Sequence, residues 1–361
     1  MGLTSYVTLG HCGLRVSPFC LGTMTFGEEW GWGSNPADSQ QILSAYLERG
    51  GNFIDTANFY TKGHSEKIIG DFLAAHRGLR ERMVIATKFC LNLHPGDPNG
   101  GGCGRKAMLS QIEHSLRRLR TDYVDLYWLH CNDPFTPVEE TLRALDDLVR
   151  SGKVRYVGFS DTPAWRVSQA QTIAQLRGWT PLIALQIEYS LLERTGEGEL
   201  IPMARELGLG VTPWSPLRSG VLSGKFTRES RADSKAARGD RLATTLNEQQ
   251  HRLMDELAVI AKELNTSVAA VSLAWVQNRP GVTSTIIGSR TERQLIDNLA
   301  ALDLDLSSEQ VQRLSRLSEP RLNFPAEFLE MWPSYAHAGA TVNGLASSLL
   351  RIAPQTPEDH Y

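Results

Sequence analysis

Four residues that could share in proton transfer stand at related places along the chain. Asp55, Lys88 and His130 each end a short apolar run, and Tyr60 follows Asp55 by five residues. A carboxylate, an ammonium group and an imidazole at such places are costly to bury unless they are paired or used in chemistry. If the three runs are neighbouring strands of one sheet, their ends converge and the four side chains form one site.

Such a set would supply the parts of a proton-transfer centre. A free phenol titrates at about pH 10, too high for an efficient acid near neutrality. A neighbouring ammonium group favours the phenolate, so we expect Lys88 to lower the pKa of Tyr60. We expect Asp55 to keep Lys88 charged, and His130 to hydrogen-bond the substrate oxygen or the phenol.

Each of these residues, taken alone, also has a purely structural explanation. Asp55 could be a helix N-cap, and Tyr60 an aromatic residue of a loop. Lys88 could extend to solvent from the end of its strand, and His130 could be a polar residue satisfied by its neighbours. The joint placement of the four is what favours a catalytic site.

The segments that must position these residues alternate between short apolar runs and helical periodicity. Strands separated by helices pair in parallel through right-handed crossovers. Eight such units predict an α/β fold of the (β/α)₈ (TIM) barrel type, whereas five to seven would have favoured an open sheet. The eight runs are 19–22, 52–55, 83–88, 124–130, 154–160, 183–186, 209–214 and 285–288.

The rest of the chain is arranged around this barrel. We expect a single domain over residues 1–361, with a barrel core at about 17–302. Apolar residues at 6–9 and 14–16, around two glycines, predict a β-hairpin that plugs the bottom of the barrel.

Three other segments are too long for ordinary connections: 88–105, 217–245 and the tail at about 319–361. The first two follow predicted strands, which places them at the C-terminal face, where barrel enzymes keep their chemistry. The tail, which contains Trp332 and Tyr335, could cap the pocket or extend into solvent.

Composition excludes several classes of protein. The formal net charge of −3 gives no basic field for nucleic acid or an acidic membrane surface. Five cysteines are scattered without a CxxC pair, which indicates reduced thiols in the cytoplasm and no metal site. The N-terminus lacks the pattern of a signal peptide, and no apolar stretch approaches the roughly 18 residues of a spanning helix.

At this point the motifs carry a family resemblance. GGNFIDTANFYTKGHSEKIIG, IATK, DLYWLH and GFS together resemble the signature of the aldo-keto reductases, and the likeness runs from LGHCGLRVSPFCLGTMTFG to IIGSRTERQLIDNL. The resemblance implies a catalytic tetrad of Asp55, Tyr60, Lys88 and His130, with Tyr60 as the general acid. It implies reduction of a carbonyl to an alcohol by hydride from NADPH, in a reaction that can also run backwards.

The resemblance also implies the residues that bind the cofactor, beginning with the nicotinamide. Polar side chains after the fifth and sixth strands hold its carboxamide, and an aromatic residue stacks under its ring. Many relatives carry Asn where this chain has Asp161, and a carboxylate can accept from the carboxamide but cannot donate to it. The matching residues at this end are Ser160, Asp161, Gln186 and Trp214, and Gly22 and Thr23 are also expected to bind the cofactor.

The other end of the cofactor falls on two later segments. SPLRSGVLSGKF resembles the segment that binds the diphosphate in the family. Its composition alone would predict only a surface loop rich in glycine and serine. Arg290 near the start of the last helix suits a 2′-phosphate and so predicts NADP(H) rather than NAD(H), although it could be a solvated charge. The matching residues are Ser215, Leu217, Gly220 and Lys225 for the diphosphate, and Gly288, Ser289, Arg290, Gln294, Asp297 and Asn298 for the adenosine.

The sequence defines the substrate less closely. Phe26, Trp30, Trp32 and Cys131 are the residues expected to line an apolar pocket, although the aromatic ones could simply pack on one another in a lid. The insertion 91–104 resembles those of bacterial branches that accept bulky carbonyls. Keto-steroids, quinones, terpenoid ketones, keto-sugars and simple aldehydes therefore all stay open, as do the physiological direction and the oligomeric state.

Two other classes of function stay open as alternatives. One is a non-enzymatic NADP(H)-sensing regulatory subunit, since the family includes β-subunits of potassium channels, but the complete tetrad argues against it. The other is a metal-dependent barrel hydrolase built on Asp55 and His130, but the strand ends lack clustered ligands such as HxH.

Overall fold

The computed structural model describes residues 2–226 and 246–359. Eight parallel strands lie side by side in the order β10-β3-β4-β5-β6-β7-β8-β9. The ends of this sheet meet through a parallel bridge between Val211 and Val282, and the Thr283 N–H donates to the Val211 carbonyl at 2.8 Å. The strands are β3 (Phe19–Gly22), β4 (Phe53–Asp55), β5 (Val84–Phe89), β6 (Val124–Leu129), β7 (Val154–Ser160), β8 (Leu182–Glu188), β9 (Gly210–Trp214) and β10 (Thr285–Gly288).

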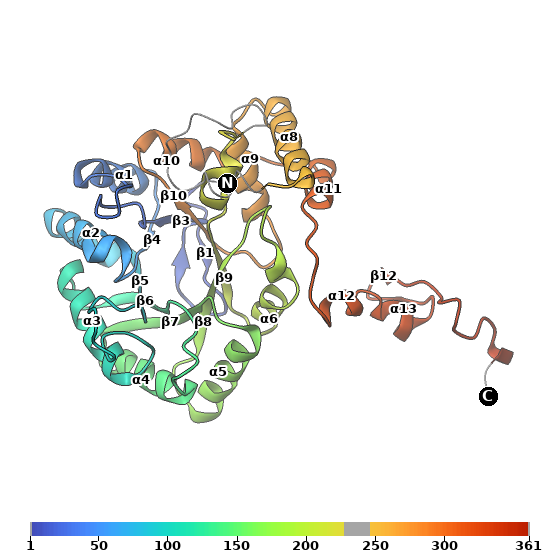
Figure 1. Ribbon diagram of the computed structural model, residues 1–361, viewed down its shortest axis with the longest axis horizontal. Coiled ribbons are helices and arrows are strands. Elements are labelled where there is room, and N and C mark those ends of the chain that lie inside the picture. The colour runs from blue at the N-terminus through green and yellow to red at the C-terminus, as the bar shows by residue number, and fades with distance from the viewer. Residues whose placement is uncertain (1, 227–245, 360–361) are drawn as a thin grey trace.

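Helices surround the sheet, so the molecule is the predicted (β/α)₈ barrel (Figure 1). Each of the eight predicted runs is a strand of it. The helices of the barrel are α1 (Pro36–Glu48), α2 (His64–Ala75), α3 (Arg105–Leu119), α4 (Val138–Arg150), α5 (Ala164–Arg177), α6 (Leu200–Glu206), α8 (Glu248–Glu263), α9 (Val268–Gln277), α10 (Glu292–Leu299) and α11 (Ser308–Leu317).

Sequence periodicity explains how these elements pack. In α3, Met108, Ile112, Leu116 and Leu119 follow one another at helical spacing, and all four are buried against the sheet. Every residue of β5 is buried, as expected for a strand that has the barrel interior on one side and helices on the other.

The predicted hairpin is present as β1 (Val7–Thr8) paired with β2 (Arg15–Val16). Leu9 and Val16 are fully buried and pack with the inward-facing side chains of the barrel. Gly10 lies at the N-terminal ends of β8 and β9, where a Cβ atom would stand 2.4 Å from the Ile183 carbonyl oxygen. The hairpin therefore closes the bottom of the barrel, opposite the strand ends that carry the predicted site.

The long segments lie where the prediction placed them, as far as they are described. Residues 90–104 follow β5 at the C-terminal face and lead into α3. Of the predicted segment 217–245, only the part up to 226 is described, and it contains the short helix η4 (Arg218–Ser223). Residues 227–245 lie outside the described chain.

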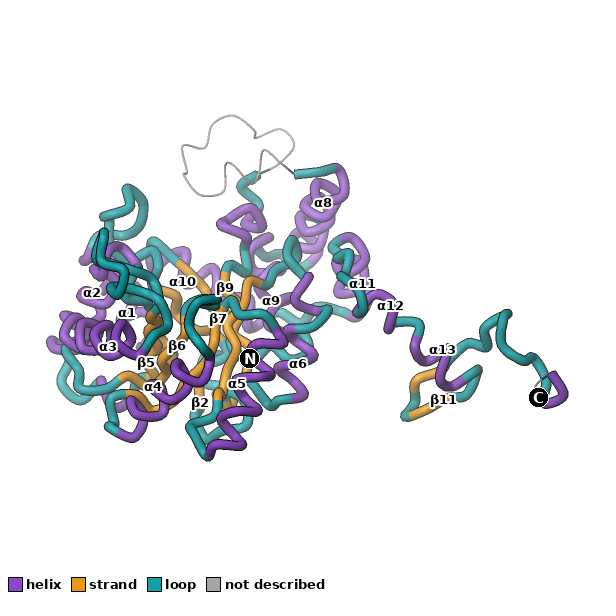
Figure 2. The backbone as a smooth tube through the Cα atoms, turned by 60° about the horizontal axis from the view of Figure 1, so that its bottom comes forward, coloured by secondary structure: helices purple, strands orange, loops and turns teal. Residues whose placement is uncertain are grey.

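The tail leaves the barrel after α11 and extends away from it (Figures 1 and 2). It contains α12 (Ala326–Leu329), α13 (Trp332–His337) and a hairpin of β11 (Thr341–Val342) and β12 (Leu345–Ala346). None of its described residues lines the cavity described below, so here the tail does not cap it.

In the described part of the chain, no single helix has both the length and the apolar character to cross a membrane. Only α8 and α9 taken together reach that length and composition, and a 99° bend separates them.

Candidate active site

The four predicted catalytic residues meet at the C-terminal ends of β4, β5 and β6. Lys88 forms an ion pair with Asp55, and its Nζ donates to the Tyr60 hydroxyl and to the Thr56 carbonyl, each at 2.9 Å. The ring of His130 stands edge-on to that of Tyr60, with 5.8 Å between the centroids. Asp55, Tyr60, Lys88 and His130 thus form one continuous cluster.

Gln186 extends this cluster across the barrel. Its Nε2 donates to Asp55 Oδ1 at 3.0 Å, while the other carboxylate oxygen faces Lys88. Thr23 donates to the Asp55 backbone carbonyl from both its N–H and its hydroxyl, at 3.0 Å each. The Asp55 carboxylate is therefore held on both oxygens, and Lys88 with it.

Burial and pairing set the charges of the cluster. Burial alone would lower the pKa of Lys88, but Asp55 and Tyr60 outweigh it and raise that pKa, so Lys88 stays an ammonium group. Burial, followed by the charge of Lys88, lowers the pKa of His130 to about 3, which leaves the imidazole neutral near neutral pH.

Tyr60 corrects one expectation. Burial of the phenol raises its pKa above the ordinary value, and the ammonium group of Lys88 offsets this only in part. The structure therefore keeps Tyr60 protonated, whereas proximity to Lys88 alone predicted a lowered pKa. The phenol can still act as a proton donor, because Lys88 stands ready to stabilise the phenolate.

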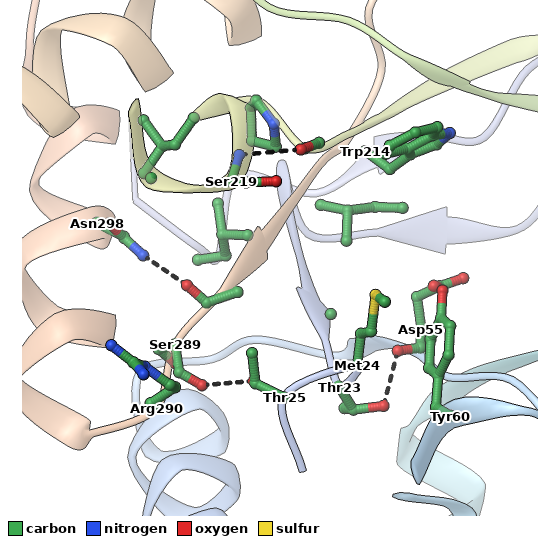
Figure 3. Close-up of a pocket in the computed structure, with 18 of the residues that line it drawn as sticks. Thr23, Met24, Thr25, Asp55, Tyr60, Trp214, Ser219, Ser289, Arg290 and Asn298 are labelled. Atoms are coloured by element: carbon green, nitrogen blue, oxygen red, sulfur yellow. Dashed lines mark hydrogen bonds between the residues drawn. The ribbon is translucent and has the colours of Figure 1, made fainter. Parts of the chain in front are cut away.

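A cavity of about 700 Å³ opens in front of this cluster and runs across the C-terminal face. Figure 3 shows Asp55 and Tyr60 at one side of it and Ser289 and Arg290 at the other. Lys88 lies behind the wall, fully buried. All sixteen residues predicted for the cofactor line this cavity: Gly22, Thr23, Ser160, Asp161, Gln186, Trp214, Ser215, Leu217, Gly220, Lys225, Gly288, Ser289, Arg290, Gln294, Asp297 and Asn298.

At the tetrad end of the cavity, two neighbouring residues differ in how they are satisfied. The hydroxyl oxygen of Ser160 is buried without a hydrogen-bond partner among the described residues. Next to it, Asp161 accepts from the indole Nε1 of Trp214 at 2.9 Å, which fixes the plane of that ring. Burial raises the pKa of Asp161 to about 6, and the bond from Trp214 opposes the rise.

At the other end, the segment from β10 to α10 is held by its own helix. The Gln294 side chain accepts from the Arg290 N–H at 2.9 Å, and Asn298 donates to the Gly288 carbonyl at 3.1 Å. Thr25 donates to the Ser289 carbonyl at 2.8 Å, which joins this segment to the loop after β3. The hydroxyl of Ser289 has no partner among the described residues although it is buried.

These features fit an extended dinucleotide. A buried hydroxyl without a partner is costly, and one occurs at each end of the cavity. The side of Gly288 that a Cβ atom would occupy is open space, so a ligand can lie against the backbone there. Lys225 and Arg290 supply cations to the lining where the sequence predicted the diphosphate and the 2′-phosphate.

Aromatic side chains form the wall beside Tyr60. The ring of Trp30 lies 5.5 Å from that of Trp32, 6.0 Å from that of Phe59 and 6.4 Å from that of Tyr60. Trp30 and Trp32 were predicted here, but Phe59 was missed, although its position next to Tyr60 was a usable signal. Met24, Thr25 and Leu91 also line the cavity and were not predicted.

Two residues predicted for the substrate pocket lie outside its lining. Phe26 is fully buried in the core, where its carbonyl accepts from Thr61 at 2.7 Å. Cys131 packs behind the pocket, 3.9 Å from the sulfur of Cys90, which in turn lies 3.4 Å from the sulfur of Cys103. Three cysteines that are scattered in sequence therefore come together, two from the long loop after β5 and one from just after the end of β6.

The described residues contain no group of three or more His, Cys, Asp or Glu side chains arranged to hold a metal ion.

Comparison with known proteins agrees with this geometry. Residues 18–319 match the sequence profile of the aldo/keto reductase family. An uncharacterized oxidoreductase of Bacillus subtilis is 39% identical over 320 residues, which cover 86% of this chain and 94% of that protein. An aryl-alcohol dehydrogenase [NADP(+)] of Phanerodontia chrysosporium is 35% identical over 332 residues, 87% of this chain and 86% of its own. A norsolorinic acid reductase of Aspergillus flavus is 34% identical over 333 residues, 90% and 84% of the two chains.

Proposed function

Because the chain belongs to the aldo/keto reductase family, it is an oxidoreductase, and we propose that it interconverts an aryl aldehyde or ketone and its alcohol with NADP(H). The observation that carries the proposal is the Tyr60 phenol, held by Lys88 at 2.9 Å at one end of a cavity that fits a dinucleotide. Aromatic residues beside Tyr60 favour a planar aromatic substrate.

In the proposed reaction Tyr60 donates its proton to the carbonyl oxygen. Lys88 stabilises the resulting phenolate, and Asp55 keeps Lys88 charged. His130 is neutral and offers an N–H to the same carbonyl oxygen, so that developing negative charge meets two donors. When bound, NADPH supplies the hydride that reduces the carbonyl carbon.

The residues that would hold the cofactor fall into three groups, which face its nicotinamide, its diphosphate and its 2′-phosphate. Trp214, fixed by Asp161, supplies a flat surface for the nicotinamide ring, and Ser160 offers its unpartnered hydroxyl to the carboxamide. Lys225 and the segment that follows β9 would hold the diphosphate. Ser289 and Arg290 would hold the 2′-phosphate, which is why we propose NADP(H) rather than NAD(H).

The aryl specificity rests on Trp30, Trp32 and Phe59. The rings of Trp32 and Phe59 are tilted against that of Trp30, whose centroid lies 6.4 Å from that of Tyr60, and such a cluster suits offset or edge-on contact with an aromatic substrate. The name of one relative, aryl-alcohol dehydrogenase [NADP(+)], agrees with this choice.

We place the reaction in the cytoplasm. All five cysteines are free thiols, including three in one cluster, and a reducing compartment preserves such thiols.

The test is consumption of NADPH, and separately of NADH, by the purified protein with paired aryl and aliphatic carbonyls of equal carbon number. We expect turnover with NADPH, a lower KM for the aryl member of each pair, and weak use of NADH. The variant Arg290→Gln serves as the matched control: it should weaken NADPH binding by about tenfold and leave NADH binding unchanged.

Two outcomes would contradict the proposal. Equal use of NADH and NADPH by the parent protein would remove the role of Arg290. Tight NADPH binding with no turnover of any carbonyl or alcohol would favour a sensing subunit instead of an enzyme.

A further inference from the structure

The tail holds more than half of the large hydrophobic side chains that are exposed in the described chain. We call residues 319–359 the arm. It contains ten of the seventeen large hydrophobic side chains that are exposed in the described chain, among them Phe324, Trp332, Leu345 and Ile352. None of its described residues is buried. Soluble monomers rarely expose apolar side chains in such a concentration, so this surface requires a partner.

The arm nevertheless has local structure of its own. The ring centroid of Phe324 lies 6.2 Å from that of Phe328, and the Phe328 ring stacks on Tyr335 with 5.9 Å between the centroids. A two-stranded hairpin follows these residues. Both views show it extending away from its own barrel (Figures 1 and 2). The arm therefore has secondary structure but no buried core, a combination that is typical of segments that pack against another subunit.

One outer helix of the barrel has the matching character. In α5, Trp165 and Leu176 are 63% and 81% exposed, and a spacing of eleven residues puts them on the same face of the helix. Phe135 is 94% exposed, and Arg166 donates to the carbonyl of the adjacent Thr136 at 3.0 Å, which ties the Phe135 segment to the first turn of α5. We call these three side chains the α5 stripe; the exposed polar side chains of Gln169 and Thr172 lie between Trp165 and Leu176 on the same face of the helix.

The charges of the arm and of α5 are also complementary. Arg166 and Arg177 are the only charged residues of α5, whereas the neighbouring α4 carries six charged residues in thirteen positions. The arm carries five acidic residues against two arginines. An acidic arm therefore suits a helix face that has cations at its two ends and no acid between them.

We propose that the arm of one copy of this chain docks on the α5 stripe of a second copy. The two copies exchange arms reciprocally, which closes a two-fold dimer. Ten half-exposed large side chains offer on the order of 1,000 Å² of apolar surface per arm. A stable interface buries about 800 Å² of each partner, an area that the apolar surface of one arm is large enough to supply.

The test is the mass of the full-length protein in solution, measured by light scattering after gel filtration over a range of concentrations. We expect two copies per particle. The double variant Trp332→Ser/Leu345→Ser in the arm and the single variant Trp165→Ser on α5 should each weaken association at least about tenfold. These side chains are exposed in the single chain, so neither change disturbs the barrel core.

Two controls make the result specific. Val259→Ser removes an exposed apolar side chain of α8, outside both surfaces, and should associate like the parent protein. A mixture of the arm variant and the α5 variant should recover a two-copy particle, because an intact arm then meets an intact stripe once per pair. A parent protein that stays monomeric, or an assembly that neither variant weakens, overturns the proposal.

Discussion

At the scale of single residues, the site depends on three protonation states that the fold sets separately. Lys88 stays charged because the carboxylate of Asp55 outweighs the effect of burial on its pKa. His130 stays neutral because burial and the charge of Lys88 both lower its pKa. Tyr60 lies between them and keeps its proton. Together they present a proton donor, a cation to stabilise the phenolate and a neutral hydrogen-bonding group at one end of the cavity.

Asp161 adds a charge whose effect on the cofactor can be tested. Its pKa is raised to about 6, with Lys88 and Glu188 as the charged groups that act on it in opposite senses. Above that pH the carboxylate stands beside Trp214, where the proposed site holds the nicotinamide. The oxidised ring is cationic and the reduced ring is neutral, so an ionised Asp161 favours NADP⁺ over NADPH.

We therefore expect the ratio of the two dissociation constants, NADP⁺ over NADPH, to fall as the pH rises from about 5 to about 8. Asp161→Asn should abolish this dependence and raise the ratio at the higher pH by something on the order of tenfold. Quenching of tryptophan fluorescence measures both constants. Equal ratios in the two proteins at about pH 8 would show that the carboxylate does not act on the cofactor.

At the scale of elements, the two ends of the barrel have different functions. The C-terminal ends of the strands carry the tetrad and the cavity, while the β1–β2 hairpin closes the opposite end. Leu9 is fully buried there among inward-facing barrel residues. The hairpin should therefore contribute to stability and leave the chemistry untouched.

Leu9→Ala should lower the free energy of unfolding by about 3 kcal/mol, because it leaves a cavity in a closed apolar core. Urea denaturation followed by circular dichroism measures the loss. Val7→Ala, at a half-buried position of the same hairpin, should cost less than about 1 kcal/mol. A large drop in turnover per folded molecule of Leu9→Ala would contradict the separation of the two ends.

At the scale of the whole molecule, the chain combines a closed barrel with an arm that the barrel does not use. The tail was expected either to cap the pocket or to extend into solvent, and it extends. A barrel of this kind has its own complete core, so the apolar arm serves assembly better than it serves folding.

Much of the barrel could be predicted from sequence because its signals are local and repeated. Eight apolar runs, each followed by a helical segment, were enough to predict the strands, and their polar ends were enough to predict that the tetrad residues meet. The cofactor positions came from motif resemblance, and all of them line one cavity.

The errors came from long-range packing. Phe26 follows the first strand closely, as a pocket residue would, but its loop turns it into the core. The pKa of Tyr60 depends on how completely the phenol is buried, and burial outweighs the nearby ammonium group. Cys131 follows His130 directly, yet it does not line the cavity, and its sulfur lies 3.9 Å from that of Cys90.

The role to test first is that of Tyr60 as the proton donor, with Lys88 and His130 stabilising the charge that develops. It is tested most directly by Tyr60→Phe, assayed side by side for NADPH binding and for reduction of the best aryl substrate. Removal of one hydroxyl should lower kcat by at least about a hundredfold, the contribution of a positioned general acid, and leave the dissociation constant of NADPH within about twofold. A variant that keeps the kcat of the parent protein would show that Tyr60 is not the proton donor.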